Sequence, residues 1–463
     1  MRKPLFALLF LLLLTLLACS LSPAATPAPS AEDAIATAVA ATLAADTPAT
    51  SATPPTEVSS TSSVEPPAPP RAVYVLEGNV WLWQPGDPTF QLTTSGDTEW
   101  VRLSSDGQLV ALLRTVARDV EGTAEETWVE EIWVVNIDGS DLRCLVSAED
   151  IARLLRPADA VDLNIAQMDW VPGTHTLAYA TMTHFDGPGV MLSNDLRLID
   201  VDTLTERTFL EPGLGGRFVF SPDGTRVAVV LPTQIDLLWL DGSTPRRHLL
   251  TYPMVSTASE FPFIARPQWS RDGSYLLVFI PPVDPLAVTP QPSTVWRLPV
   301  DGSPASQIAA FTTARYWGVS DPTPLFDPTL NYLAYMTEEG EEGEEVSLHV
   351  AALDGSGDIV LASAPQISFF GWAPLGQRFT YAAGDAPPLL VRVDGSTSSL
   401  TDDGLREVRR VVWVTDDIFL LGLGHCATGG CNWQLRFDTL SSSGGLLATT
   451  TNNYGISSID VTR

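Results

Sequence analysis

Residues able to carry out acid–base or metal chemistry are sparse in this chain of 463 residues. The five histidines, His175, His184, His248, His349 and His425, show no His-Glu-x-x-His spacing and no Cys-x-x-Cys partner. The sequence also contains no Gly-x-Ser-x-Gly elbow and no P-loop. We therefore predict no catalytic residues, no metal and no other cofactor, although scattered ligands that converge in the fold stay open as an alternative.

Two of the four cysteines are spaced for a disulfide. Cys426 and Cys431 bracket Ala-Thr-Gly-Gly, a flexible stretch that lets the two thiols meet. A small disulfide-closed loop is expected, and a metal pair with His425 nearby is the alternative. Cys144 has no evident partner and is expected to be a small buried apolar residue.

The N-terminus is typical of a bacterial export signal. Arg2 and Lys3 precede an apolar run, residues 5–17, that is too short to cross a bilayer as a helix. The run ends in Leu-Leu-Ala-Cys at Cys19, which resembles a lipobox. The resemblance implies cleavage before Cys19 and lipidation of its thiol, so that residues 1–18 are a signal peptide. An ordinary signal peptide is the alternative, and the sequence does not say which membrane holds the anchor.

The next segment differs in composition from the rest of the chain. Residues 19–70 are rich in Ala, Pro, Thr and Ser, and cannot bury enough apolar surface to fold alone. We expect a disordered, extended stalk in which residues 31–46 form at most a transient helix. The whole chain carries a formal charge of −29, so nucleic acid is not an expected partner.

From residue 71 onward, short apolar strands alternate with turns, and one unit recurs. Its first turn, Ser-x-Asp-Gly, is clear at residues 104–107, 221–224 and 270–273, and degenerate at 170–173, 326–329, 372–376 and 413–417. A second turn, Asp-Gly, begins at Asp138, Asp241, Asp301, Asp354 and Asp394. Asp and Ser side chains bond to their own turn backbone, and Gly supplies a positive φ.

The recurring Trp/Phe-Ser-Pro-Asp-Gly turn before an apolar strand resembles the repeat of TolB-type (WD40-like) β-propellers. The resemblance covers residues 71–463 and implies an all-β fold, a single propeller of four-stranded blades. It does not imply one function, because propellers of this type include binding modules, scaffolds, peptidase domains and lyases.

Blade number follows from the phase of the strands, labelled A to D from the centre outward. Residues 72–94 match strands B, C and D, seven complete units follow from Trp100 to about Thr450, and residues 454–463 match a lone strand A. Pairing this tail with the opening strands would close the ring and remove its open edges. Eight blades are predicted, and seven are the alternative if one degenerate unit is an insertion.

Long connections are predicted on only one face. Consecutive strands are antiparallel, so A–B and C–D turns share one face, and B–C and D–A connections share the other. The long segments are the B–C loops 116–131, 181–194, 281–293, 337–345 and 422–431 and the D–A connections 147–166, 252–265 and 312–324. Such loops commonly carry binding residues, so we interpret this long-loop face as functional. Tolerated insertion is the alternative.

The start of each A strand should line the channel mouth on that face. Aligning the units on the A–B turn places one residue per blade there: Trp100, Gln167, Arg217, Arg266, Thr323, Phe369 and Arg410. The three arginines could bind an anion, since guanidinium pairs with carboxylates bidentately. Arg315, Tyr316 and Trp317 could add a stacking wall. The alternative is that these arginines pair with nearby acids or blade-end carbonyls.

These features predict an extracytoplasmic, membrane-tethered propeller that acts as a binding or scaffolding module for a protein, peptide or anionic glycan. The residue pattern does not favour an enzyme. A propeller lyase or hydrolase acting on an acidic polysaccharide is the alternative. The acidic run 338–345 is expected to be a solvated loop, and a cation or basic partner is its alternative role. We expect a monomer.

Overall fold

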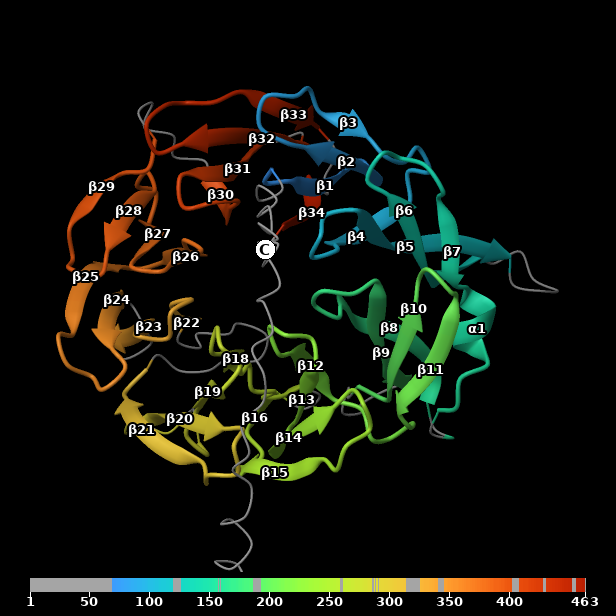
Figure 1. Ribbon diagram of the computed structural model, residues 1–463. Helices are drawn as coiled ribbons and strands as arrows, with labels where there is room; N and C mark the ends of the chain where they lie inside the picture. Colours follow the sequence, from blue (N-terminus) through green and yellow to red (C-terminus); the bar gives the residue numbers. More distant parts are fainter. Residues whose placement is uncertain are drawn as a thin grey trace, which may run out of the picture. The chain divides into compact units, whose positions relative to one another are not determined.

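The computed structural model describes residues 69–463 apart from 120–125, 157, 159, 186–192, 259–260, 285–286, 288, 290, 314–324, 340–344, 402–407, 428–429, 452–454 and 463. Within this part of the chain, antiparallel sheets follow one another around a ring, with the A strand of each sheet toward the centre (Figure 1). The predicted signal peptide, Cys19 and almost all of the predicted linker 19–70 lie outside the described residues.

Eight sheets have four strands each. In ring order, and from the centre outward, the blades are β34 (Ile456–Val461), β1 (Ala72–Leu76), β2 (Asn79–Trp83) and β3 (Phe90–Gln91); β4 (Thr98–Leu103), β5 (Leu109–Asp119), β6 (Glu126–Asn136) and β7 (Arg143–Val146); β8 (Ala160–Trp170), β9 (Thr176–Phe185), β10 (Leu196–Asp200) and β11 (Thr205–Leu210); β12 (Arg217–Phe220), β13 (Arg226–Leu231), β14 (Gln234–Trp239) and β15 (Arg246–Thr251); β18 (Gln268–Trp269), β19 (Tyr275–Ile280), β20 (Ser293–Pro299) and β21 (Ser306–Phe311); β22 (Leu325–Phe326), β23 (Tyr332–Glu339), β24 (Glu345–Ala352) and β25 (Ile359–Ala364); β26 (Ile367–Trp372), β27 (Arg378–Ala383), β28 (Leu389–Arg392) and β29 (Thr397–Ser399); β30 (Val408–Trp413), β31 (Ile418–Ala427), β32 (Gly430–Thr439) and β33 (Leu446–Thr450). A small hairpin, β16 (Ser256–Ala258) with β17 (Phe261–Pro262), and one helix, α1 (Ala148–Ala152), lie in the connections.

The two ends of the ring belong to one blade. β34 pairs antiparallel with β1, with Ala72 opposite Val461, and Thr462 N–H donates to the carbonyl of Arg71. This closure confirms the predicted phase, in which the C-terminal tail supplies strand A to the opening B, C and D strands. The fold is therefore the predicted all-β propeller with eight blades.

The repeated A–B turn has the geometry that its residues predict. Ser104 Oγ lies 2.6 Å from Asp106 Oδ1 and accepts from the N–H of Leu109, while Gly107 has φ +68°. At the equivalent turn, the hydrogen bond from Ser270 is the main cause that lowers the pKa of Asp272 to about 2. These local bonds form without help from distant residues, which is why the turn is visible in the sequence.

A degenerate turn reaches the same shape with other residues. Asp327 takes the place of serine, because its Oδ1 accepts from the N–H groups of Asn331 and Tyr332, each at 2.7 Å. Leu330 takes the place of glycine and has φ +56°. The unit at residues 326–329 is thus a true blade turn and no insertion.

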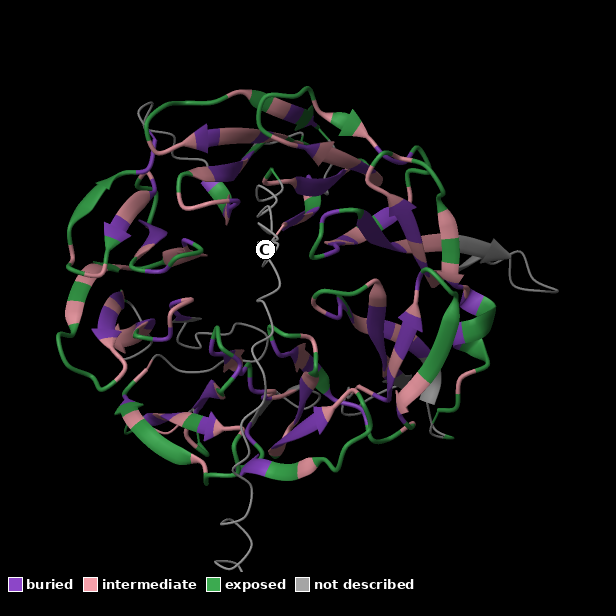
Figure 2. Cartoon of the chain, in the orientation of Figure 1, coloured by how far each residue is buried: buried purple, intermediate pink, exposed green. Residues whose placement is uncertain are grey.

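The core lies between the blades rather than at the centre of the ring. Clusters of buried aliphatic and aromatic side chains alternate with the sheets, and Figure 2 shows the buried residues running through the middle strands. Tryptophans at the ends of A strands connect neighbours: Trp170 Nε1 donates to the carbonyl of Arg102, and Trp269 Nε1 donates to the carbonyl of Val219. Burial between radial sheets is what holds the ring together.

The outer edge of most blades is irregular. Six of the eight blades have a register shift where strand C pairs with strand D, while β3 and β29 have only two and three residues. Asp236, which is buried, accepts from the N–H of His248, a residue with φ +57° on the bulged strand β15. Bulged or short outer strands disfavour edge-to-edge pairing with another chain.

Two expectations from the sequence are wrong. Several predicted B–C loops are largely strand: β5 and β6 continue to Asp119 and from Glu126, and β31 and β32 leave only 428–429 between them. Backbone hydrogen bonds between two strands do not require apolar side chains. Hairpins that project from the ring therefore lack the apolar alternation of a buried strand, and the sequence pattern did not identify them as strands. Cys144 is exposed, and its pKa is raised to about 11, mainly by local desolvation and then by Glu131.

Candidate functional site: the long-loop face

The described residues that were aligned at the channel mouth, one per blade, occupy equivalent places in their blades. In six blades, the N–H at the start of the A–B turn donates to the carbonyl of the residue five positions later, as Ser221 does to Arg226 and Ser270 does to Tyr275. In a seventh blade, Val414 donates to the carbonyl four positions later. In each of these seven blades, the residue four positions before this N–H is the one that the sequence alignment placed at the channel mouth. All A strands start at the face that carries the D–A connections, so the described residues of this set lie at the long-loop end of the central channel.

The eighth blade has a member that the sequence alignment missed. The Thr462–Arg71 bond is the turn bond of the closing blade, so Ser458 holds the equivalent position there. Ser458 was not found because its A–B turn is split between the two ends of the chain, and no turn motif marks it.

Two residues at this position connect blades. Gln167 Nε2 donates to the carbonyl of Phe218 at 2.7 Å, and its Oε1 accepts from the N–H of Phe218. Ser458 Oγ accepts from the N–H of Val101 at 3.3 Å. These bonds pair backbone polar groups on the free inner edge of the next A strand. Gln167 and Ser458 therefore have a structural role at this position.

The three arginines differ from these capping residues in exposure. Arg217 begins β12, Arg266 lies two residues before β18, and Arg410 lies in β30 opposite Gly422; all three are exposed. Trp100 is half-buried, and the guanidinium of Arg102 lies over its ring at 4.3 Å. Phe369 packs in an aromatic cluster with Trp372 and Phe379, so its blade offers no polar group at this position. Arg315, Tyr316, Trp317 and Thr323 lie outside the described residues.

Four hairpins or strand pairs extend the long-loop face. They are β5–β6, β8–β9, β23–β24 and β31–β32, and the first two are connected where Glu130 accepts from the N–H of Ile165. The acidic run extends the third, where Glu338, Glu339 and Glu345 are in strands and residues 340–344 lie outside the described part.

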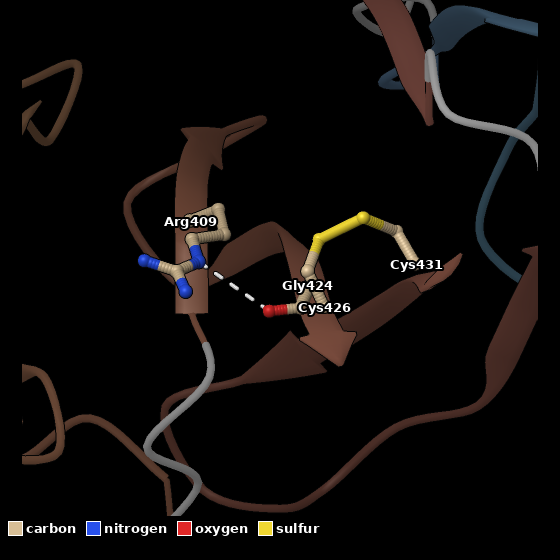
Figure 3. Close-up of a disulfide and its surroundings, with 4 residues drawn as sticks. All are labelled: Arg409, Gly424, Cys426 and Cys431. Atoms are coloured by element: carbon tan, nitrogen blue, oxygen red, sulfur yellow. Dashed lines mark hydrogen bonds between the residues drawn. A yellow bond between two sulfur atoms is a disulfide. The ribbon is translucent and has the colours of Figure 1, made fainter. Parts of the chain in front are cut away.

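A disulfide joins the two strands of the fourth hairpin near its tip. Cys426 and Cys431 lie opposite each other in β31 and β32, with Cα atoms 4.0 Å apart (Figure 3). On the inner side of this hairpin, Arg409 Nε donates to the carbonyl of Gly424 at 3.3 Å (Figure 3). The disulfide therefore fixes a projecting element of the long-loop face, beside the A strand that carries Arg410.

The opposite face, which we call the tight-turn face, is bonded from blade to blade. Arg71 Nη1 donates to the carbonyl of Gly107, and Gly173 N–H donates to Ser105 Oγ. A Cβ added to Gly224, whose φ is +66°, would lie 2.3 Å from the carbonyl oxygen of Pro172. An insertion in such a turn would break contacts with the neighbouring blade. Packing alone is therefore a sufficient reason why insertions gather on the long-loop face, and their distribution is weaker evidence for function than the sequence suggested.

His175 lies on the tight-turn face and bonds to two blades. Its Nε2 lies 3.0 Å from Asp106 in the preceding blade, and its Nδ1 lies 2.9 Å from Asp202 in its own blade. The hydrogen bond with Asp106, followed by that with Asp202, raises the pKa of His175. This arrangement connects two blades electrostatically and lies away from the channel mouth.

Among the described residues, no group of three or more His, Cys, Asp and Glu side chains is placed to hold a metal ion. The side chain of His184 lies outside the described part. No helix in the described part of the chain is long and apolar enough to span a membrane.

No protein-family model and no curated protein matches this chain. Solved structures that resemble it include the Dos1 propeller, at 14% identity, 80% coverage of this chain, 88% of that chain and a TM-score of 0.48. An oligogalacturonate lyase in complex with manganese is 14% identical over 70% of this chain and 83% of that one, with a TM-score of 0.42. The putative TolB from Agrobacterium tumefaciens is 14% identical over 58% and 93% of the two chains, with a TM-score of 0.31. At such low identities and scores no activity is transferred, and the chain is a β-propeller on the evidence of its own strand pairing.

Proposed function

We propose that this protein is a membrane-tethered, extracytoplasmic binding or scaffolding propeller that takes a protein, peptide or anionic glycan on its long-loop face. The lipobox-like sequence that ends at Cys19 and the Ala/Pro/Thr/Ser-rich segment 19–70 support the tether. The observation that carries the binding role is the exposure of Arg217, Arg266 and Arg410 at equivalent channel-mouth positions.

Their chemistry favours an anionic ligand. Acidic residues outnumber basic ones by 55 to 26 in the whole chain, so three exposed arginines at one end of the channel are a local exception. Guanidinium groups bind carboxylates through paired hydrogen bonds and keep their charge at every physiological pH.

The attachment point of the linker is consistent with this role. β1 is a B strand, so the chain enters the ring on the tight-turn face, where Arg71 contacts Gly107. The long-loop face therefore lies opposite the point at which a tether would join the ring. A tethered propeller attached there has its channel-mouth arginines on the side away from the attachment.

The binding role can be tested with two soluble polyanions, polygalacturonate and poly-L-glutamate, measured by calorimetry against the full-length chain. A variant with Arg217→Ala, Arg266→Ala and Arg410→Ala should bind at least about tenfold more weakly, since each lost charged contact typically contributes ~1 kcal/mol or more. Its melting temperature is measured beside that of the unaltered chain, so that a loss of binding is separated from a loss of folding.

A matched control removes the same charge elsewhere, with Arg207→Ala, Arg271→Ala and Arg392→Ala, three exposed arginines away from the channel mouth. It should bind as the unaltered chain does. Equal affinities of the two triple variants, or no binding of the unaltered chain to either polymer, would contradict the proposal. The tether is tested separately: Cys19→Ala should move the protein from the membrane fraction to the soluble fraction.

A further inference from the structure

A hydroxyl, an imidazole and a carboxylate are hydrogen-bonded in series in the sixth blade, which consists of β22–β25 (Figure 1). Thr337 Oγ1, in β23, lies 3.0 Å from Nε2 of His349, in β24. Nδ1 of the same ring lies 3.2 Å from Oδ2 of Asp358, which immediately precedes β25. A nucleophile, a base and a group that orients the base are connected in this way in enzymes that form covalent intermediates.

The carboxylate decides which nitrogen of the imidazole carries the proton. An ionised Asp358 can only accept a hydrogen bond, so a neutral His349 holds its proton on Nδ1 and leaves Nε2 as an acceptor. The hydroxyl of Thr337 therefore donates to Nε2, the atom placed to remove its proton. A base within hydrogen-bond distance of the hydroxyl is the first geometric requirement of general-base catalysis.

A tyrosine holds the imidazole ring in place. Tyr335 lies opposite His349 in the ladder between β23 and β24, and the two rings stack with their centroids 4.7 Å apart. Burial raises the pKa of Tyr335, and its interactions with Asp358, which include a hydrogen bond, raise it further. Tyr335 therefore contacts both the base and the carboxylate that orients it, so little reorganisation is needed when a substrate arrives.

The series reaches solvent at the outer rim of the ring. The side chain of His349 is 13% exposed and that of Asp358 is 38% exposed, while Thr337 is half-buried. Val360, opposite His349 in the outer strand β25, is 56% exposed, so this end of the sheet face is open to solvent. The rim, and not the channel mouth, is therefore the side from which a small molecule can reach the imidazole.

Further hydroxyl groups lie on the same face of the sheet. Ser347 is opposite Thr337 in the ladder, and its Oγ lies 2.6 Å from Oγ of Ser363 in β25. Hydroxyl groups beside a nucleophile can donate hydrogen bonds to an oxygen on which negative charge develops. The acidic run, residues 338–345, connects β23 and β24, so the local potential favours an uncharged substrate over an anionic one.

We propose that this site, at the rim of the sixth blade, hydrolyses small uncharged acyl esters. Thr337 is the nucleophile, His349 is the base and then the acid, and Asp358 is a positioning residue. The activity goes beyond the binding role proposed above and lies in another part of the ring. The sequence pattern missed the site because the three residues, 12 and 9 positions apart, match no motif that the sequence was searched for.

The reaction has two halves. In the first, Oγ1 of Thr337 bonds to the carbonyl carbon of the ester while its proton passes to Nε2 of His349. The tetrahedral intermediate then expels the alcohol, which takes that proton, and an acyl-threonine remains. In the second half, water attacks the acyl carbon and gives a proton to Nε2, and the bond from the acyl carbon to Oγ1 breaks. The free acid leaves, and the proton returns from Nε2 to Oγ1.

The test measures hydrolysis of p-nitrophenyl acetate by the full-length chain. His349→Gln keeps hydrogen-bonding groups but supplies no base, so kcat/KM should fall about 100-fold or more. Thr337→Val removes the hydroxyl and keeps the shape, so it should cause a similar loss, whereas Thr337→Ser should stay within about threefold of the unaltered chain. Asp358→Asn should lower kcat at least about tenfold and change KM less than about twofold, as expected of a residue that orients the base.

A matched control is His425→Ala, which removes an exposed histidine of another blade and should leave the rate within about twofold. Melting temperatures of all variants show whether a loss of turnover reflects unfolding. A second measurement needs no variant: the unaltered chain is treated with a fluorophosphonate and its peptides are mapped by mass spectrometry. The adduct should lie on Thr337, because such reagents react with activated hydroxyl groups.

Loss of turnover in folded His349→Gln and Thr337→Val, together with an adduct on Thr337, would support the proposal. Equal rates for the unaltered chain and His349→Gln would overturn it, and so would an adduct on another residue or the absence of both turnover and adduct. Binding of polygalacturonate should be the same in these variants and in the unaltered chain, so failure of the esterase site is distinguished from failure of the binding role.

Discussion

Ring closure depends on two side chains of the last strand that bond to the next blade. Asp460 Oδ2 accepts from the N–H of Leu103 at 2.8 Å, and Ser458 Oγ accepts from the N–H of Val101 at 3.3 Å. Both N–H groups face the free inner edge of β4, and Val101 and Leu103 are buried. Removing both acceptors by Ser458→Ala and Asp460→Ala leaves two buried N–H groups without partners.

The cost follows from this burial. A buried donor left unsatisfied costs about 1–3 kcal/mol, so the double variant should lose about 2–6 kcal/mol of unfolding free energy. Unfolding entropy is about 2.1 cal/mol/K per residue, so for a ring of roughly 390 residues each kcal/mol lowers the melting temperature by ~1.2 °C. A decrease of about 2–7 °C is expected, measured by circular dichroism and checked by urea denaturation.

Two controls separate the lost hydrogen bonds from other effects. Asp460→Asn keeps an acceptor oxygen and should retain most of the stability. Ser457→Ala removes an exposed hydroxyl that donates to Glu99, so it should change the unfolding free energy by less than about 0.5 kcal/mol. A double variant as stable as the unaltered chain, or an Asn variant as unstable as the Ala variant, would refute this account of the closure.

Three further predictions concern the two faces. For His175→Ala, the loss of unfolding free energy should be about 1 kcal/mol greater at pH 5.5 than at pH 9. The pKa of the half-buried His175 is raised in the folded state. The stabilisation that protonated His175 gives to the fold is therefore complete below about pH 6.5, and it disappears as the pH rises through the folded-state pKa. A loss independent of pH would contradict the ion-pair account. Gly224→Ala should lower the unfolding free energy by about 2–4 kcal/mol, because Gly224 has a positive φ and an added Cβ would meet the carbonyl of Pro172. Gly242 also has a positive φ but faces open space, so Gly242→Ala should lower the unfolding free energy by only about 1 kcal/mol. Urea denaturation measures both changes. Reduction of the 426–431 disulfide should speed proteolysis within its hairpin and lower the unfolding free energy by no more than about 2 kcal/mol; unchanged cleavage would show that the disulfide does not hold the tip.

The asymmetry of the two faces has a physical reason in the packing of the turns. Gly376 and Asp327 show it clearly, since a Cβ on Gly376 would lie 2.5 Å from a carboxylate oxygen of Asp327 in the neighbouring blade. Turns on the tight-turn face therefore tolerate little change, and the opposite face is where the chain can vary. The case for a binding surface rests on which side chains are exposed there.

Much of the ring could be predicted because its signals are local. Turn residues such as Ser221 and Asp223 bond within the turn, so the repeat, its phase and the pairing of the last strand with the first follow from spacing along the chain. The channel-mouth positions could be aligned for the same reason, since each lies a constant number of residues before a turn.

The exposure of Cys144 shows where local patterns fail. It pairs with Trp133 at the point where β6 and β7 shift register. A shift of one residue sends the following side chains to the other face of a sheet, and nothing in the apolar alternation of β7 reveals it. The bulge arises from packing at the blade edge, which depends on the neighbouring strands.

By itself, the sequence determined the repeated blade, the number of blades and the way the ring closes, because turn chemistry and strand alternation act between residues a few positions apart. Only the tertiary structure decided which residues meet across blades, such as Ser458 with Val101 and His175 with Asp106, and which of the aligned channel-mouth residues remain exposed. Those contacts join positions far apart in the chain and exist only once the closed ring places neighbouring blades side by side.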